Sequence, residues 1–227
     1  MSSIKAQARW AGVIYVVMSL LGISALLYLP RLFVAGDPAA TAANIMSHEP
    51  TYRLILFGSL LGSILFVVLG WSLYHLFEAV DRKQAMLLLV LVVTSAVIGI
   101  IDVALLATPL VFSSGAAFLA AIPRPELDAL SLGFLQVREF ELHANIALWG
   151  LWLIPFGVLV IKSRFIPPVI GWLLFVACAG YLALSFGFIV LPAYAHAIGR
   201  VAGVMIQAEL PVILWLVIMG AKAPAPR

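Results

Sequence analysis

Three ionisable residues lie within long apolar stretches of the sequence: Asp102, His143 and Glu209. Two more acids, Glu139 and Glu141, stand at the start of the stretch that contains His143. An ionisable side chain inside a bilayer costs free energy, so such residues are functional candidates by default. Acids and an imidazole of this kind can hold a proton, a small solute or a metal ion.

A metal site is one interpretation. Glu139 and His143 are four residues apart, which places them on the same face of a helix. Zinc accepts both nitrogen and oxygen ligands, so Glu209 could complete a set of three. Asp102 would then act as general base toward a metal-bound water. This pattern predicts an intramembrane metal-dependent hydrolase with a divalent metal as cofactor.

Two interpretations need no metal. The acids could form a buried hydrogen-bonded network, compensated by Arg53 or Arg138, that only fixes helix packing in a structural or partner subunit of a membrane complex. The interpretation that we favour is a polar site open to the outside that binds or transports a small solute, a lipid or a proton. Asp102 and Glu209 would be its titrating or coordinating acids, and Arg53 a further ligand-binding residue.

Weaker polar candidates are Tyr15 and Asn145, each of which stands within an apolar stretch. The one cysteine, Cys178, also lies in an apolar run, so it indicates neither a disulfide framework nor a cysteine zinc site. The motifs of soluble phosphate-binding, serine-hydrolase and zinc-protease sites are absent from the sequence.

The composition sets the class of protein that must position these groups. Of 227 residues, 64% are hydrophobic and 10% are charged, whereas a soluble domain carries about a quarter charged residues. This balance excludes an aqueous enzyme, a nucleic-acid-binding protein and a disordered chain. The partner that it implies is the lipid bilayer.

Six apolar stretches reach the length of about 20 residues that a helix needs to cross a bilayer. They cover residues 10–30, 54–79, 84–112, 140–161, 168–191 and 203–221. We therefore expect an all-α integral membrane bundle of six transmembrane helices that forms a single domain over residues 1–227.

The two long connections between these stretches each predict a short helix. Asp37 and Pro38 form a typical helix start, with an acid at the N-cap and a proline at the first position. Pro125 begins a segment with apolar residues on one helical stripe, which indicates a helix that lies on the membrane surface or caps the bundle.

Basic residues predict the orientation, because cytoplasmic loops are enriched in Lys and Arg. With a cytoplasmic N-terminus, the inner segments hold Lys5, Arg9, Arg82, Lys83, Lys162, Arg164, Lys222 and Arg227. The outer segments then hold Arg31, Arg53, Arg124, Arg138 and Arg200. The inner segments therefore hold more basic residues than the outer ones, which favours both termini inside and both long connections outside.

This topology places the acids in the outer half of the membrane. At 1.5 Å per residue, Asp102 lies about 15 Å below the outer end of its helix and Glu209 about 9 Å below the start of the sixth stretch. His143 lies about 6 Å below Glu139 by the same rise. We therefore expect the three helices to present these groups at a similar depth.

A set of short blocks spread over nearly the whole chain is similar to a known family. The blocks are residues 8–15 (ARWAGVIY), 36–38 (GDP), 41–45 (TAANI), Arg53, 73–74, 162–167 (KSRFIP), Gly171, 180–181, Glu209, 214–216 and Gly220. In these blocks the sequence resembles the bacterial membrane family catalogued as domain of unknown function 4386.

The resemblance implies a bacterial multi-pass membrane protein and no particular activity. We therefore expect the chain to lie in the bacterial cytoplasmic (inner) membrane. It includes the polar residues Asp37, Asn44, Arg53 and Glu209. Asp102, Glu139 and His143 stand outside its blocks, so they are candidates only because of their residue types, their spacing and their depth in the expected spans.

Overall fold

The structure is a computed structural model that describes residues 4–221. Every regular element in that range is helical. Six helical stretches are long and apolar enough to cross a membrane: Ile4–Arg31, Glu49–Phe77, Arg82–Phe112, Arg124–Ser163, Pro168–Val190 and Pro192–Ile218. The expected all-α membrane bundle with six spans is therefore confirmed.

Several spans consist of more than one helix. In chain order the α-helices are α1 (Ile4–Tyr28), α2 (Pro38–Ser47), α3 (Glu49–Phe77), α4 (Arg82–Leu106), α5 (Thr108–Phe112), α6 (Arg124–Leu151), α7 (Leu153–Ser163), α8 (Pro168–Val190), α9 (Ala195–Ile206) and α10 (Leu210–Ile218). Short 3₁₀ turns separate some of them: η1 (Leu29–Arg31), η2 (Ala117–Leu119), η3 (Pro192–Tyr194) and η4 (Gln207–Glu209).

Large apolar side chains cover the outside of the bundle. Phe57 on α3 is 64% exposed and Val204 on α9 is 74% exposed, and they are two of many. A protein surrounded by water does not present so continuous an apolar surface. The multi-pass helices thus have a surface suited to contact with lipid.

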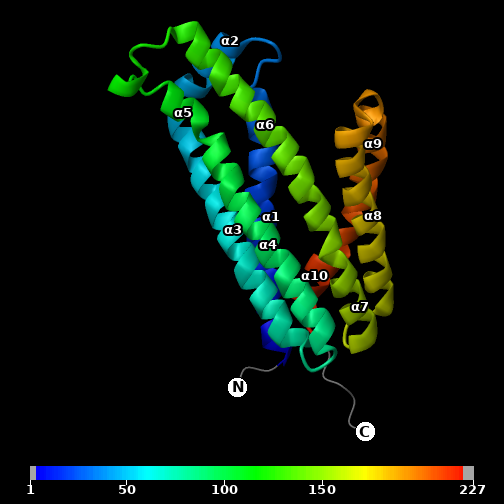
Figure 1. Ribbon diagram of the computed structural model, residues 1–227. Coiled ribbons are helices and arrows are strands. Elements are labelled where there is room, and N and C mark those ends of the chain that lie inside the picture. Colours follow the sequence, from blue (N-terminus) through cyan, green and yellow to red (C-terminus); the bar gives the residue numbers. More distant parts are fainter. Residues whose placement is uncertain (1–3, 222–227) are drawn as a thin grey trace.

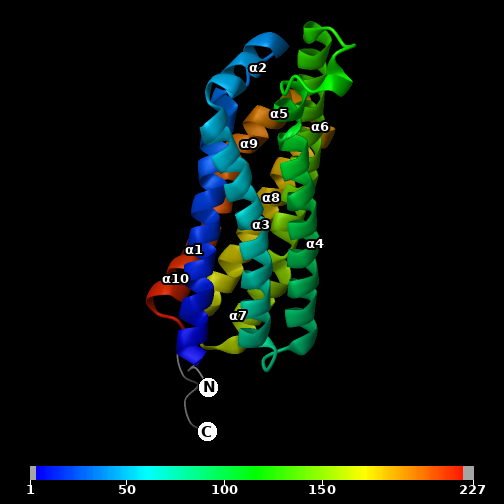
Figure 2. The same cartoon turned by 90° about the vertical axis from the view of Figure 1, so that its left-hand side faces the viewer.

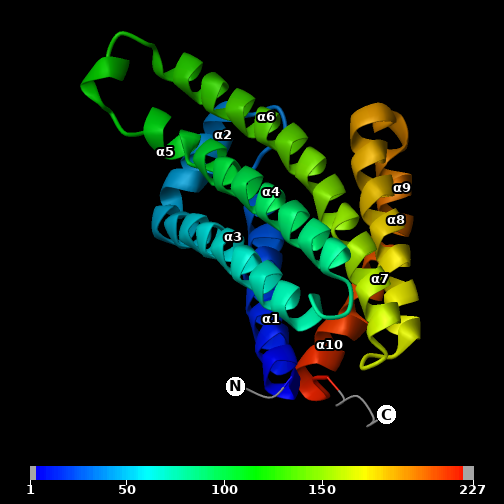
Figure 3. The ribbon, with the colours of Figure 1, turned by 60° about the horizontal axis from the view of Figure 1, so that its bottom comes forward.

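The helices follow one another around the bundle, and the last one returns to the first. Within the bundle, α1 packs against α3, α3 against α4, and α4 against α6 (Figures 1 and 2). In Figure 1, α8 and α9 form a separate pair beside the lower part of α6. Figure 3 shows α10 leaving that pair and lying against α1. An Arg9 Nη2 hydrogen bond to the Ile218 carbonyl, at 2.9 Å, joins the two helices.

Of the two short helices expected in the long connections, the first is α2. Asp37 caps it, because its Oδ1 accepts a hydrogen bond from the Ala40 N–H at 2.9 Å. The second is not a separate helix. The segment after Pro125 is the first half of α6, which continues without interruption through the expected start of the fourth span at Phe140.

Two prolines divide the fourth and sixth spans. Pro155 follows the end of α6 by four residues, and Pro211 follows η4 closely. Proline has no backbone N–H and clashes with the carbonyl four residues earlier, so a helix bends there. The sixth span also begins at Pro192, well before the expected start at Gly203, since α9 belongs to it.

The N-terminal end of α1, the α3–α4 turn and the α7–α8 turn share one end of the bundle (Figure 1). An ion pair joins the two turns: Lys162 Nζ lies 2.6 Å from Asp81 Oδ2. Asp81 also caps α4 by accepting the Lys83 and Gln84 N–H groups, both at 3.1 Å. Lys222 and Arg227, two of the basic residues that predict the orientation, lie outside the described residues.

The Asp81–Lys162 pair gives a pH-dependent prediction. The hydrogen bond from Lys162 holds the pKa of Asp81 below its usual value, so its contribution to stability is present at neutral pH and is lost as the pH falls through that lowered pKa. Asn also caps helices well, so Asp81→Asn removes mainly the ion pair. We expect a lower thermal midpoint at neutral pH and a difference from wild type that disappears in acid.

Thermal unfolding of the detergent-solubilised protein at several pH values measures this effect. Adding Lys162→Met to Asp81→Asn is expected to cause no further loss. A constant difference between wild type and Asp81→Asn at every pH would contradict the account.

Candidate functional site

Glu209 is held by two tyrosines from two different helices. The Tyr15 hydroxyl on α1 donates to Glu209 Oε1, and the Tyr181 hydroxyl on α8 donates to Oε2 at 2.7 Å. Neither partner carries a positive charge. Among residues 4–221, no cationic side chain contacts this carboxyl group, so the only side-chain groups that bind it are two neutral hydroxyls.

The break in the sixth span explains why both tyrosines reach the same side chain. The chain runs along α8 as α9, turns through η4, and then lies along α1 as α10. Glu209 is the last residue of η4 and the N-cap of α10. The partial positive charge of a helix N-terminus favours an anion at this position.

Tight packing fixes both tyrosines. The Tyr15 ring lies 5.8 Å from the Trp152 ring, measured between centroids, and Trp152 is only 2% exposed at the α6–α7 bend. On the other side, a Cβ added to Gly150 would lie 2.9 Å from the Tyr181 Cβ, so only glycine lets α6 approach α8 this closely. The site therefore depends on α1, α6, α8 and the broken sixth span.

Glu209 lies near the middle of the membrane-spanning region. At the rise of an α-helix, Tyr15 is about 16 Å along α1 from Ile4, and Tyr181 is about 20 Å along α8 from Pro168. Counted from Pro192, Glu209 is about 25 Å into its span. The expected depth of about 9 Å is wrong, because the span begins earlier than its apolar run indicated.

A second polar cluster lies further toward the α2 end of the bundle. Asp102 on α4 and Arg138 on α6 are 8% and 9% exposed, and they form a two-point ion pair. Arg138 Nε lies 2.8 Å from Asp102 Oδ1, and Nη2 donates to Oδ2 at 3.1 Å. Asp102 is about 30 Å along α4 from Arg82, well above the level of Glu209.

Glu141 belongs to the same cluster. Its side chain lies within hydrogen-bonding reach of Asp102. Both of its carboxylate oxygens are buried and have no donor among residues 4–221. On α3, the Tyr52 hydroxyl beside this cluster donates to the Leu106 carbonyl at 2.6 Å, so its proton is already used.

A third polar contact joins α4 to α6, seven residues before Asp102 along α4. Ser95 Oγ on α4 donates to Asn145 Oδ1 on α6 at 2.6 Å, and Asn145 Nδ2 donates to the Ser95 carbonyl at 3.2 Å. Arg138, Glu141 and Asn145 are spaced three and four residues apart along α6. They form one polar stripe that packs against α4.

The structure does not gather the residues proposed for a metal site. Within residues 4–221, no three His, Cys, Asp or Glu side chains are close enough to hold a metal ion. His143 Nδ1 contacts the Glu139 backbone carbonyl at 2.8 Å, and its ring stacks on Phe188 at 3.6 Å. Glu139 is exposed, and Glu209 is held elsewhere by the two tyrosines.

The structure also shows which of the two arginines pairs with a buried acid. Arg53 does not compensate a buried acid, since it pairs with Glu49 one turn earlier at 2.7 Å on the surface. Arg138, the other arginine proposed from the sequence, compensates the buried acid Asp102. The single outward-facing site expected from three helices is thus two sites, one on α4 and α6 and one at the break of the sixth span.

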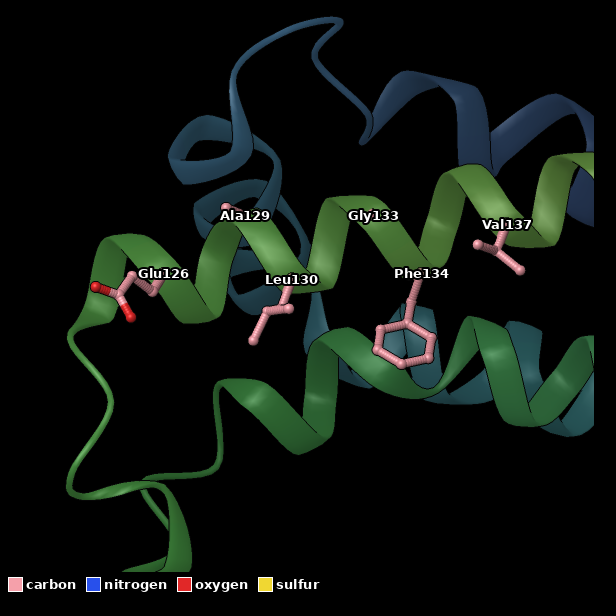
Figure 4. Close-up of a pocket in the computed structure, with 6 residues that line it drawn as sticks. All are labelled: Glu126, Ala129, Leu130, Gly133, Phe134 and Val137. Atoms are coloured by element: carbon pink, nitrogen blue, oxygen red, sulfur yellow. The ribbon is translucent and has the colours of Figure 1, made fainter.

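A shallow hollow of about 630 Å³ lies along the outer face of α6 (Figure 4). Its lining residues all come from that helix: Glu126, Ala129, Leu130, Gly133, Phe134 and Val137. The picture shows Phe134 and Leu130 directed toward the neighbouring α5 segment. None of the candidate site residues lines this hollow.

Tyr181 is a functional candidate that the sequence alone does not single out, since it stands only in a family block. For Glu141, the sequence indicates an acid at the start of an apolar stretch but not its contact with Asp102. Glu141 is three residues after Arg138 and four before Asn145, so the three residues share one face of a helix. This pattern is visible in the sequence only if residues 124–139 are taken as part of the same helix. Tyr181 carried no such signal, because its partner is distant in the sequence.

Comparison with known proteins gives one result. The family model described as domain of unknown function (DUF4386) matches residues 10–220. No curated protein and no solved structure matches the chain.

Proposed function

The chain belongs to the DUF4386 family, and from that premise we propose that it carries protons across a bacterial cytoplasmic membrane, with Glu209 as the group that gains and releases the proton. The proposed orientation puts the N-terminus and the Asp81 turn in the cytoplasm. The observation that carries the proposal is the Glu209 carboxyl group, held near the middle of the bundle by two tyrosine hydroxyls and by no cation among residues 4–221.

The chemistry of this environment supports a proton-exchanging group. A carboxylate that only stabilises packing inside a bilayer is normally paired with a cation, as Asp102 is with Arg138. At Glu209 the two hydroxyls and the N-terminus of α10 complement the negative form without neutralising it. Because hydroxyl groups also accept hydrogen bonds, the same tyrosines can partner the protonated form.

The broken span supports movement as well as binding. Discontinuous transmembrane helices commonly form ion and substrate sites near the membrane midplane of transporters. Here the break places the carboxyl group between α1 and α8, two helices that belong to different sides of the bundle. A movement of α9 against α10 would shift Glu209 relative to Tyr15 and Tyr181.

Proton movement in liposomes tests this function. Purified protein is reconstituted with a pH-sensitive dye inside, and a potassium gradient with valinomycin sets an inside-negative potential. We expect potential-driven acidification with wild type and a fall to the protein-free rate in Glu209→Gln. Tyr15→Phe is expected to give an intermediate rate, since one hydrogen bond to the carboxyl group remains.

Glu139→Gln is the matched control, because Glu139 is an exposed acid on α6. Its rate is expected to equal that of wild type. Wild-type liposomes that acidify no faster than empty ones, or a Glu209→Gln rate equal to wild type, would overturn the proposal.

A further inference from the structure

We propose that Asp102 and Glu141 share one exchangeable proton beside Arg138, which makes this cluster a second proton-binding site, separate from Glu209. The proposal stands whether or not Glu209 carries protons. It begins from the two Glu141 carboxylate oxygens, which are buried and lack any hydrogen-bond donor in the described part of the chain.

A buried acceptor without a donor is costly, and a buried charge without a partner costs more. Among the described residues, the only cation in this cluster is the Arg138 guanidinium. Its Nη2 donates to Asp102 Oδ2, and its Nε lies 2.8 Å from Asp102 Oδ1 without making a hydrogen bond. Tyr52 cannot supply the missing donor, because its hydroxyl donates to the Leu106 carbonyl. A proton held by Glu141 or Asp102 would supply a hydrogen-bond donor at this position.

The position of Glu141 beside Asp102 is consistent with a proton shared between the two carboxyl groups. The Glu141 and Asp102 side chains are within hydrogen-bonding reach of each other. Two ionised carboxylates at that separation repel, whereas one proton between them turns the contact into a hydrogen bond of the acid–carboxylate kind. The titratable and charged groups that face this pair are Tyr52 from α3 and Arg138 from α6.

Charge balance favours a proton over a metal ion. Two carboxylates and one guanidinium leave a single negative charge in excess, and one proton removes it. A metal ion would have to lie beside the guanidinium group, which would repel it. A neutral cluster is also the arrangement that costs least in a membrane-spanning bundle.

Infrared difference spectra between acid and alkaline buffer test this site, and the Glu209→Gln protein is the background so that Glu209 does not contribute. We expect a band of a protonated, buried carboxyl group that remains at neutral pH. The band is expected to be lost in Glu141→Gln and to be lost or shifted in Asp102→Asn. Glu139→Gln, on the same helix but exposed, is expected to leave it unchanged.

Stability provides the second readout. Glutamine has nearly the shape of a protonated glutamate and can donate to Asp102, so Glu141→Gln is expected to keep the thermal midpoint of the parent protein. A spectrum without a protonated carboxyl band at neutral pH, or a band that persists in both Glu141→Gln and Asp102→Asn, would overturn the proposal.

Discussion

Replacing Arg138 by methionine is expected to lower the free energy of unfolding by about 3–5 kcal/mol, the usual cost of leaving a buried charge without its partner. Arg138 is 9% exposed and makes the two-point contact with Asp102 that joins α6 to α4. Methionine fills a similar volume, so the loss reports the charge more than a cavity. Unfolding of the purified protein, followed by helical circular dichroism in a denaturing detergent titration, measures it.

The control is Arg53, which also forms an ion pair with a carboxylate but lies on the surface. Arg53 pairs with Glu49, but its side chain is 61% exposed, so Arg53→Met is expected to change stability by less than about 1 kcal/mol. Combining Arg138→Met with Asp102→Asn is expected to recover part of the loss, because the unpaired charge is then gone. Equal effects of Arg138→Met and Arg53→Met would contradict the buried ion pair.

Replacing Gly12 by leucine is expected to destabilise the protein by about 1–3 kcal/mol and also to abolish proton movement. A Cβ at this position would lie 2.6 Å from the Val217 backbone nitrogen and 2.9 Å from the Leu216 Cβ. α10 would have to move away from α1. Since Tyr15 lies one turn further along α1, that displacement would separate its hydroxyl from Glu209.

Gly22 on the same helix provides the matched control. Nothing lies within 4 Å of a Cβ added there, so Gly22→Leu is expected to leave both the midpoint of unfolding and the proton flux in liposomes near the wild-type values. If Gly12→Leu kept wild-type flux, the close contact between α1 and α10 would not position Glu209.

The bundle and its first short helix could be predicted from local sequence signals. The six apolar stretches are separated by polar or proline-containing segments, and the Asp37–Pro38 start is a local capping pattern that the structure reproduces. These features depend on residues close together in the chain. Membrane spanning adds a length requirement that hydropathy measures directly.

The course of α6 could not be predicted in the same way. Residues 124–139 contain Arg124, Glu126, Asp128, Arg138 and Glu139, so their composition is typical of a loop outside the membrane. Ion pairs stabilise their helix instead: Asp128 pairs with Arg124 at 3.0 Å, and Arg138 pairs with Asp102 on another helix. Hydropathy does not detect a polar helix face that is buried against a polar partner.

The separation of the two sites also needed the structure. The similar depth expected for Asp102 and Glu209 in the membrane favoured a single site that contains both. Glu209 instead meets Tyr15, 194 positions earlier in the sequence, because the proline-linked break returns the chain to α1. Spacing along a helix fixes which residues share a face, but it does not fix which helices are neighbours.

The most direct test of the central claim is the number of protons that the folded protein takes up when the pH of a lightly buffered detergent solution is lowered, measured with an indicator dye. Over a range from about pH 10 to about pH 4, wild type is expected to take up about one proton per chain more than Glu209→Gln. Equal uptake by the two proteins, with both folded, would show that Glu209 does not exchange a proton with the solution and would contradict the account.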